Sequence, residues 1–226
     1  MLAFSSLLGN VEGQNIYRIW YDKPASYWEE ALPVGNGRIA AMVFGDPQLE
    51  QIQLNEETVS AGSPYQNYNE EAKTALPEMR RLIFEGKYEE AQNMAATKIL
   101  SQVGNEMPYQ TVGRLNIRYQ DHKKVNNYYR DLDISNAVAV TRYEVDGVEF
   151  TEETFASFTD QLVIRHIKAS KPGTINCELF FNTPMRDPKR SIYGKKGLRL
   201  EGITHGSRYF PGKVHYCADL DVKHKG

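Results

Sequence analysis

Cysteine is nearly absent from this chain, which has two, Cys177 and Cys217, in 226 residues. Two cysteines are too few to define a disulfide framework or a cysteine-rich metal centre. Cys217 lies two residues after His215, but a zinc site needs two further ligands at a suitable spacing, and neither His205 nor His224 completes one. We therefore expect no metal and no cofactor. A single bridge between the two cysteines stays open, because their distance is not encoded in the sequence.

The chain also lacks an excess of charge of either sign. It has 27 Lys and Arg against 29 Asp and Glu, a formal net charge of −2 and a sequence pI of about 6.2. This balance gives no reason to expect a nucleic acid partner. The apolar stretch at residues 1–9 is too short to span a bilayer, so we expect no membrane span.

Residues 1–9 are nonetheless rich in apolar and small side chains, and residues 10–14 turn polar. This order is typical of the end of a secretory signal peptide, although the basic segment that normally precedes it is absent. A disordered or docked tail is the alternative. We therefore expect residues 1–14 to be a signal-peptide remnant or a disordered tail, and the protein to be secreted or periplasmic.

Most of the chain has the pattern of short strands separated by turn residues, from Ile16 to about residue 60 and again from residue 112. Asp146 and Gly147 form a two-residue connection of the type favoured in hairpins. Residues 161–169 and 174–181 form a second strand-turn-strand unit around residues 171–173. Many short strands joined by turns favour a sandwich over a parallel α/β fold.

Between these β regions the apolar residues recur at helical spacing, from about residue 69 to residue 100. Asn69 is expected to cap the first helix, Pro77 to begin a fresh turn, and Gly86 to end it. A second short helix is expected from residue 88 to residue 100. The predicted fold is therefore mainly β: an antiparallel two-sheet β-sandwich of the super-sandwich type, with a short helical insertion around residues 69–100.

Two segments near the start have a distinctive order of residues. Residues 32–45, LPVGNGRIAAMVFG, place Gly35, Asn36 and Gly37 before a buried strand, as in a tight turn. The glycines match no phosphate-binding pattern. Residues 51–58, QIQLNEET, form an alternating strand with a polar end, and sites are commonly built at strand ends.

Further pieces follow in order: residues 108–117, PYQTVGRLNI, and then 129–134, 137–143, 146–147 and 153–157. Together, over about residues 16–220, these segments resemble the N-terminal domain of glycoside hydrolase family 95, the inverting α-L-fucosidases and related α-L-galactosidases. Two departures are clear. Residues 59–64 lack the aromatic of the family's Leu-Trp-Ser-Gly-Gly-Pro stretch, and Arg114 replaces the acid of its Tyr-Gln-Pro-Leu-Gly-Asp-Leu pattern.

The resemblance implies that residues 15–226 are a non-catalytic N-terminal β-sandwich domain, truncated before its last strands and before a missing (α/α)6 catalytic domain. That barrel, the protein's own C-terminal domain, and a fucosylated glycan substrate are the implied partners. No catalytic residue is assigned here. We expect adjacent acids to be solvated and to point to opposite faces of their strands; these pairs are Glu29–Glu30, Glu56–Glu57 and Glu152–Glu153.

Four polar residues of the first two segments are the candidates for a substrate pocket or domain interface: Asn36, Arg38, Asn55 and Glu56. Local turn hydrogen bonding is the simpler role for them. An alternative function is a stand-alone carbohydrate-binding module, in which exposed tyrosines stack on sugars; the candidates are Tyr65, Tyr68, Tyr128 and Tyr129. A third is a scaffold or dimer surface.

Overall fold

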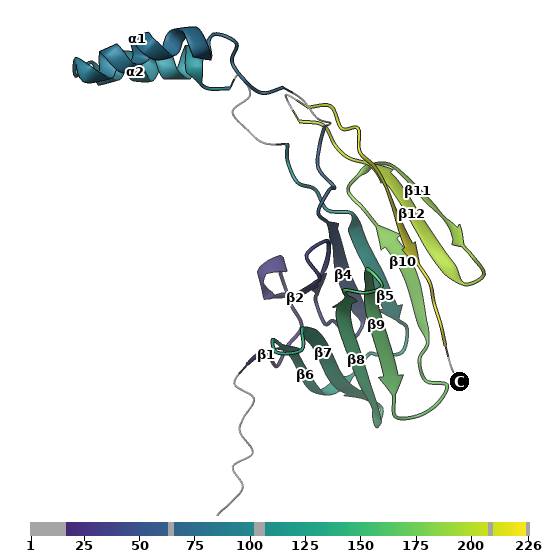
Figure 1. The fold of residues 1–226 in the computed structure, drawn as a ribbon. Coiled ribbons are helices and arrows are strands. Elements are labelled where there is room, and N and C mark those ends of the chain that lie inside the picture. Colours follow the sequence, from purple (N-terminus) through teal and green to yellow (C-terminus); the bar gives the residue numbers. More distant parts are fainter. Residues whose placement is uncertain (1–16, 63–65, 102–106, 208–209, 225–226) are drawn as a thin grey trace, which may run out of the picture.

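The computed structural model describes residues 17–62, 66–101, 107–207 and 210–224. It confirms a mainly β chain in which all paired strands are antiparallel (Figure 1). The expected signal-peptide remnant at residues 1–14 lies outside the described residues. No helix in the described part is both long and apolar enough to cross a membrane.

Two five-stranded sheets and one three-stranded sheet make up the β structure. The first sheet has the order β1 (Arg18–Tyr21), β6 (Val125–Asp133), β7 (Val138–Val145), β8 (Val148–Ser157) and β9 (Leu162–Ala169). The second sheet has the order β10 (Cys177–Asn182), β5 (Gly113–Tyr119), β4 (Leu49–Glu56), β3 (Ile39–Val43) and β2 (Leu32–Gly35). The third sheet has the order β11 (Arg186–Tyr193), β12 (Gly197–Ile203) and β13 (His215–Leu220).

The first and second sheets pack face to face, as expected for a sandwich. A single apolar cluster joins Ile52, Leu115 and Ile117 of the second sheet to Leu132 and Ala139 of the first. Ile52 lies between the half-buried Gln51 and Gln53, whereas on β5 the residue between Leu115 and Ile117, Asn116, is itself buried. In both strands every second side chain points into the apolar cluster. The prediction of a β-sandwich is therefore confirmed.

The third sheet extends this core, and the sequence did not predict it as a separate sheet. Leu200 of β12 is completely buried in the same apolar cluster as Phe181 of β10. Polar contacts add to this packing, because the Oγ1 of Thr183 lies 2.9 Å from the hydroxyl of Tyr216 and Arg190 Nε donates to the Phe181 carbonyl at 2.8 Å. The third sheet is thus fastened along the β10 edge (Figure 1).

The two predicted strand-turn-strand units have different outcomes. Asp146 and Gly147 join β7 to β8 with φ angles of 50° and 77°, the left-handed conformations that a tight hairpin turn requires. The segment 171–173 is different, because β9 belongs to the first sheet and β10 to the second. It therefore carries the chain from one layer to the other and forms no hairpin, a choice that depends on which partners each strand finds.

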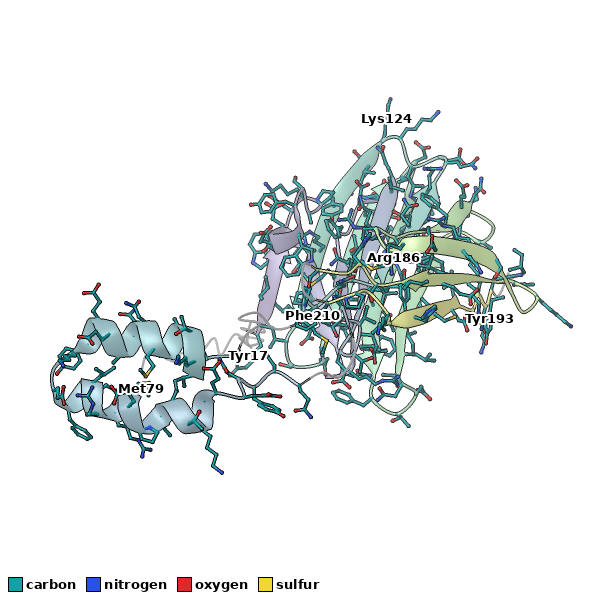
Figure 2. All side chains as sticks on the ribbon, turned by 90° about the horizontal axis from the view of Figure 1, so that it is seen from above. Tyr17, Met79, Lys124, Arg186, Tyr193 and Phe210 are labelled. Atoms are coloured by element: carbon teal, nitrogen blue, oxygen red, sulfur yellow. The ribbon has the colours of Figure 1, made fainter. Side chains whose placement is uncertain are left out.

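The helical insertion is confirmed as α1 (Ala72–Phe84), α2 (Tyr88–Met94) and a π-helical continuation, η2 (Ala95–Ile99); a short 3-10 turn, η1 (Trp28–Glu30), lies elsewhere. Gly86, with φ of 75°, follows the end of α1 as predicted. The helices form a hairpin that projects away from the sheets, with Met79 between them (Figures 1 and 2).

One detail of the helical prediction is wrong, because Pro77 lies inside α1 and begins no fresh turn. Asn69 lies two residues before the N-cap position, Glu71, but its Oδ1 accepts from the Glu71 N–H at 3.0 Å, as a capping side chain does. Its Nδ2 donates to the carbonyls of Thr97 and Leu100 at 3.2 and 3.4 Å. Asn69 thus ties the start of the hairpin to its end, a long-range role that local propensity does not encode.

A groove of about 870 Å³ runs between β9 and the end of β13. Its apolar floor includes Leu115, Ile117 and Leu179, and each of the two strands is the last in its sheet among the described residues. Cys177 also lines it; Cys177 and Cys217 are both free thiols, so the bridge left open by the sequence is not formed.

Because unpaired strand edges beside exposed apolar side chains favour association, we expect the isolated chain to self-associate with rising concentration. Ile175 lines the groove and is 44% exposed, so Ile175→Asp should weaken the association in sedimentation velocity. Ile83→Asp, at a 42% exposed position of α1 that belongs to no sheet edge, is the control and should leave it unchanged. A monomer at every concentration would contradict this expectation.

Candidate functional site

The four predicted site residues lie at one end of the second sheet. Asn36 and Arg38 belong to the turn between β2 and β3, and Asn55 and Glu56 end β4. The antiparallel register places Glu56 opposite Ile39, directly after the turn. Residues some twenty positions apart in sequence are thereby brought to the same strand ends.

Asn36 has a structural role in this turn. It is buried, its Oδ1 accepts from the N–H groups of Arg38 and Ile39 at 3.1 and 3.0 Å, and its Nδ2 donates to the Ser157 carbonyl of the first sheet at 2.8 Å. Gly37, with φ of 90°, supplies the left-handed backbone that completes the turn. Local turn hydrogen bonding, the simpler role considered above, is therefore present at Asn36, together with a link between the two sheets.

Arg38 and Glu56 form a surface ion pair, with Nε and Oε1 3.3 Å apart. The other carboxylate oxygen of Glu56 accepts from the N–H and the hydroxyl of Thr58 at 2.8 and 2.6 Å. Burial by itself raises the pKa of Glu56, but the Thr58 hydrogen bonds and the charge of Arg38 outweigh it and hold the pKa below its usual value. Glu56 is thus a fixed anion at neutral pH, suited to accepting hydrogen bonds. That it contacts a substrate stays a prediction.

The third distinctive segment, residues 108–117, reaches the same place. Tyr109 forms a β-bridge with Ser60, Ala61 N–H donates to the Pro108 carbonyl at 2.9 Å, and Gln110 N–H donates to the Val59 carbonyl at 2.8 Å. We call the β2–β3 turn, residues 55–60 and residues 108–112 the strand-end corner. Three separate motifs of the chain converge there.

Tyr109 and Gln110 also lie at this corner and were not among the residues predicted from the sequence. Tyr109 is 55% exposed, and the Gln110 side chain is fixed by two 2.8 Å hydrogen bonds to the backbone of His205. Their position inside the segment 108–117 was the signal that could have found them.

Beside the strand-end corner, a hollow of about 260 Å³ opens on the outer face of the second sheet. Gln53 and Arg114 alternate with the buried Ile52 and Leu115, so they face outward. Gln53 Nε2 lies 3.5 Å from Asn55 Oδ1, which links the hollow to the corner. None of the residues that line it carries a carboxylate: Gln53, Thr111, Gly113, Arg114, Asn182, Thr183 and Pro184.

Two enclosed carboxylates, those of Glu50 and Glu152, lie between the two sheets, away from this surface. Arg165 Nη2 contacts Glu50 Oε2 at 2.7 Å and also contacts Glu152, while the hydroxyls of Tyr119 and Tyr143 donate to Glu152 Oε1 at 2.7 and 2.6 Å. We call these five residues the buried ionic cluster. Glu152 is 1% exposed, so the expectation of a solvated side chain was wrong for it. Its neighbour Glu153 is partly exposed, with 40% of its side-chain surface accessible to solvent.

Burial, which disfavours the charged form, raises the pKa of Glu50 to about 7. Glu50 and Glu152 are fully enclosed by protein, so a sugar has no access to either carboxylate. The buried ionic cluster therefore holds the two sheets together and offers no acid to a substrate.

Of the four tyrosines proposed to stack on sugars, those that the structure describes differ in their exposure to solvent. Tyr65 lies outside the described residues, and Tyr128 is wrong as a platform because it is half-buried and its hydroxyl donates to the Gly45 carbonyl at 2.6 Å. Tyr68 is exposed. Tyr129 stacks on Trp20 with ring centroids 6.3 Å apart, and Trp20, which the sequence analysis did not select, is 61% exposed.

Residues 19–225 match the family model described as glycosyl hydrolase family 65, N-terminal domain. The chain is similar to Alpha-L-fucosidase 2 of Arabidopsis thaliana, with 37% identity over 181 residues, which cover 77% of this chain and 21% of the relative. It is also similar to the Probable alpha-fucosidase A of Aspergillus niger, at 26% identity with 67% and 20% covered. The corresponding protein of Aspergillus oryzae is 25% identical, with 88% and 28% covered. The chain thus spans about a fifth to a quarter of the length of these relatives.

Proposed function

The chain belongs to the family of glycosyl hydrolase family 65 N-terminal domains, and from this premise we propose that it is the non-catalytic N-terminal domain of a hydrolase acting on terminal α-L-fucosides. The similarity to Alpha-L-fucosidase 2 carries this proposal. The parent enzyme is of the family 95 type, and it cleaves with inversion, between an acid and a base on opposite sides of the sugar. Terminal α-L-galactosides are the related substrate class.

In this proposal the parent's own C-terminal (α/α)6 barrel carries the acid and the base, and the strand-end corner faces that barrel. Two features support this arrangement. Three separate motifs converge at the corner, and its Arg38 and Tyr109 are exposed, as side chains that contact another domain or a substrate must be. Glu56 is held as an anion there, so it would accept hydrogen bonds from sugar hydroxyl groups or from the barrel.

A secreted or periplasmic location is part of the proposal. It rests on the apolar residues 1–9 followed by the polar residues 10–14, the order found at the end of signal peptides.

A stand-alone carbohydrate-binding module is the second candidate, favoured by one observation. Trp20 is 61% exposed and stacks on the half-buried Tyr129, and sugars stack on exposed aromatic faces. In that case a fucosylated oligosaccharide would perturb the Trp20 fluorescence of the chain, and Trp20→Ala would abolish the change. A scaffold role would instead show as self-association without any effect of sugar.

The proposed function is tested by assaying an aryl α-L-fucoside with the 226-residue chain and with the full-length parent protein. We expect turnover by the parent alone, with the β-anomer of fucose as the first product in NMR spectra. Hydrolysis by the purified chain, with a contaminating glycosidase excluded, would overturn the proposal.

The corner is tested in the parent by Glu56→Gln, which removes a fixed anion while retaining the shape of the side chain. We expect kcat/KM to fall by about tenfold or more, as for loss of a hydrogen bond to a charged group. Glu178→Gln, at an exposed ion pair on the outer face of β10, is the control and should leave kcat/KM within about twofold. If the two substitutions had equal effects on kcat/KM, the strand-end corner would not be part of the substrate site.

A further inference from the structure

Two arginines on β5 have nearly the same setting but differ in their partner. Arg114 and Arg118 both face outward, and each guanidinium lies over a phenylalanine ring, at 5.7 Å from Phe44 and 4.8 Å from Phe180 respectively. Arg118 Nη1 pairs with a carboxylate, Glu178 Oε2, at 2.7 Å. Arg114 Nη1 instead donates at 2.7 Å to a neutral amide oxygen, that of Gln51. Within the described residues, Arg114 has no carboxylate at ion-pair distance.

The guanidinium of Arg114, which has no carboxylate partner among the described residues, lines the hollow on the outer face of the second sheet. The Phe44 ring and Gln51 hold its guanidinium from two sides, so little side-chain freedom remains to be lost on binding a ligand. Gln53 and Asn182, which line the same hollow, each add an amide that donates and accepts hydrogen bonds. The hollow is smaller than the pockets that enclose drug-sized ligands, so it suits one substituent of a larger molecule.

We propose that Arg114 and this hollow bind an anionic substituent of a glycan, the sulfate ester or the carboxylate of a sugar unit. The planar guanidinium presents parallel N–H donors to two oxygens of such a group, and the amides of Gln53 and Asn182 reach the neighbouring sugar oxygens. This inference rests on the proposed function, because it takes the ligand to be part of the glycan. It assigns to the domain a specificity for charged glycans.

Charge decides between this ligand and a neutral sugar. All hydrogen-bonding groups of the lining apart from Arg114 are neutral, so an uncharged ligand would leave the guanidinium without a counter-charge. Arg114 therefore favours an anionic ligand over a neutral one at this surface.

The test is an NMR titration of the 226-residue chain at constant ionic strength. Three probes are compared: methyl α-L-fucopyranoside, its sulfate monoester and methyl glucuronide. We expect saturable shifts of the Gln53 and Asn182 side-chain amide signals with at least one charged probe and none with the neutral one. Saturation by the sulfate ester alone assigns a sulfated sugar, and saturation by the glucuronide alone assigns a uronate. Equal binding of all three probes, or no saturation, would overturn the inference.

Variants at two matched positions show where the probe binds. Arg114→Gln should lower the affinity for the charged probe by about tenfold or more. Arg114→Lys should have an intermediate affinity, because lysine keeps the positive charge but lacks the parallel N–H donors of the guanidinium. Arg118→Gln, four residues along the same strand, should leave binding within about twofold. Native-like spectra of the free variants establish that each is folded. Wild-type affinity in Arg114→Gln would refute the site.

Failure of this inference and failure of the proposed function give different results. A parent enzyme that hydrolyses fucosides while the chain binds no anionic sugar would overturn only this inference. An inactive parent would overturn only the proposed function.

Discussion

Replacing Arg165 with methionine is expected to lower the free energy of unfolding by about 3–5 kcal/mol at pH 7, since it leaves a buried ion pair without its cation. Arg165 contacts both Glu50 and Glu152, and its Nη1 donates to Thr154 Oγ1 at 2.7 Å. Methionine fills a similar volume to arginine, so the loss of stability measures the removal of the cation beside Glu50 and Glu152 and not the creation of a cavity. Urea denaturation followed by circular dichroism measures it.

The control for this substitution is Arg118→Met. Arg118 also pairs with a glutamate, but its side chain is 51% exposed, and an exposed pair contributes about 0–1 kcal/mol. Because burial raises the pKa of Glu50 to about 7, its side chain is protonated at pH 5 and needs no cation there, so the cost of Arg165→Met should shrink at that pH. Similar losses in the two variants would show that burial of the cluster contributes nothing to its strength.

The second large effect is a loss of stability as the pH rises. The folded protein holds the proton of Glu50 up to a pKa of about 7, against an ordinary value of 4.5. The contribution of Glu50 is therefore fully present below pH 4.5 and is lost as the pH rises through about 7. A shift of this size corresponds to about 3 kcal/mol.

Glu50→Gln isolates this contribution, because an amide does not titrate. We expect the stability of the wild-type protein, relative to Glu50→Gln, to fall by about 3 kcal/mol between pH 4.5 and pH 7.5. Other carboxyls, such as Asp133 and Asp219, have lowered pKa values, so their stabilisation is lost only as the pH falls below their usual range. A parallel pH dependence of the two proteins would show that Glu50 titrates normally.

The candidate site could be predicted from the sequence in part. The turn at residues 35–37 and the polar end of β4 were visible as local patterns, and β pairing brings Arg38 and Glu56 into contact. Asn36 shows the limit of such patterns. Its turn hydrogen bonds are local, whereas its bond to Ser157 spans 121 residues, and only the packing of the two sheets creates it. The hollow around Arg114 needs β4, β5 and the end of β10 side by side, which no local pattern reveals.

The sequence by itself determined the elements whose cause is local. Alternation of apolar residues predicted strands, helical spacing predicted the insertion, and Asp146 with Gly147 predicted a hairpin. The ordered motifs also predicted the N-terminal domain of a glycoside hydrolase related to α-L-fucosidases. The match to the N-terminal domain model and the similarity to Alpha-L-fucosidase 2 confirm this relationship.

Tertiary structure decided how these elements are partnered. It separated β9 from β10 into different layers, added the third sheet, and buried Glu152 where a solvated acid was expected. The physical reason is that burial of a charge depends on its counter-charge. Arg165 lies 115 residues from Glu50 in the chain, and only the assembled sandwich brings the two together.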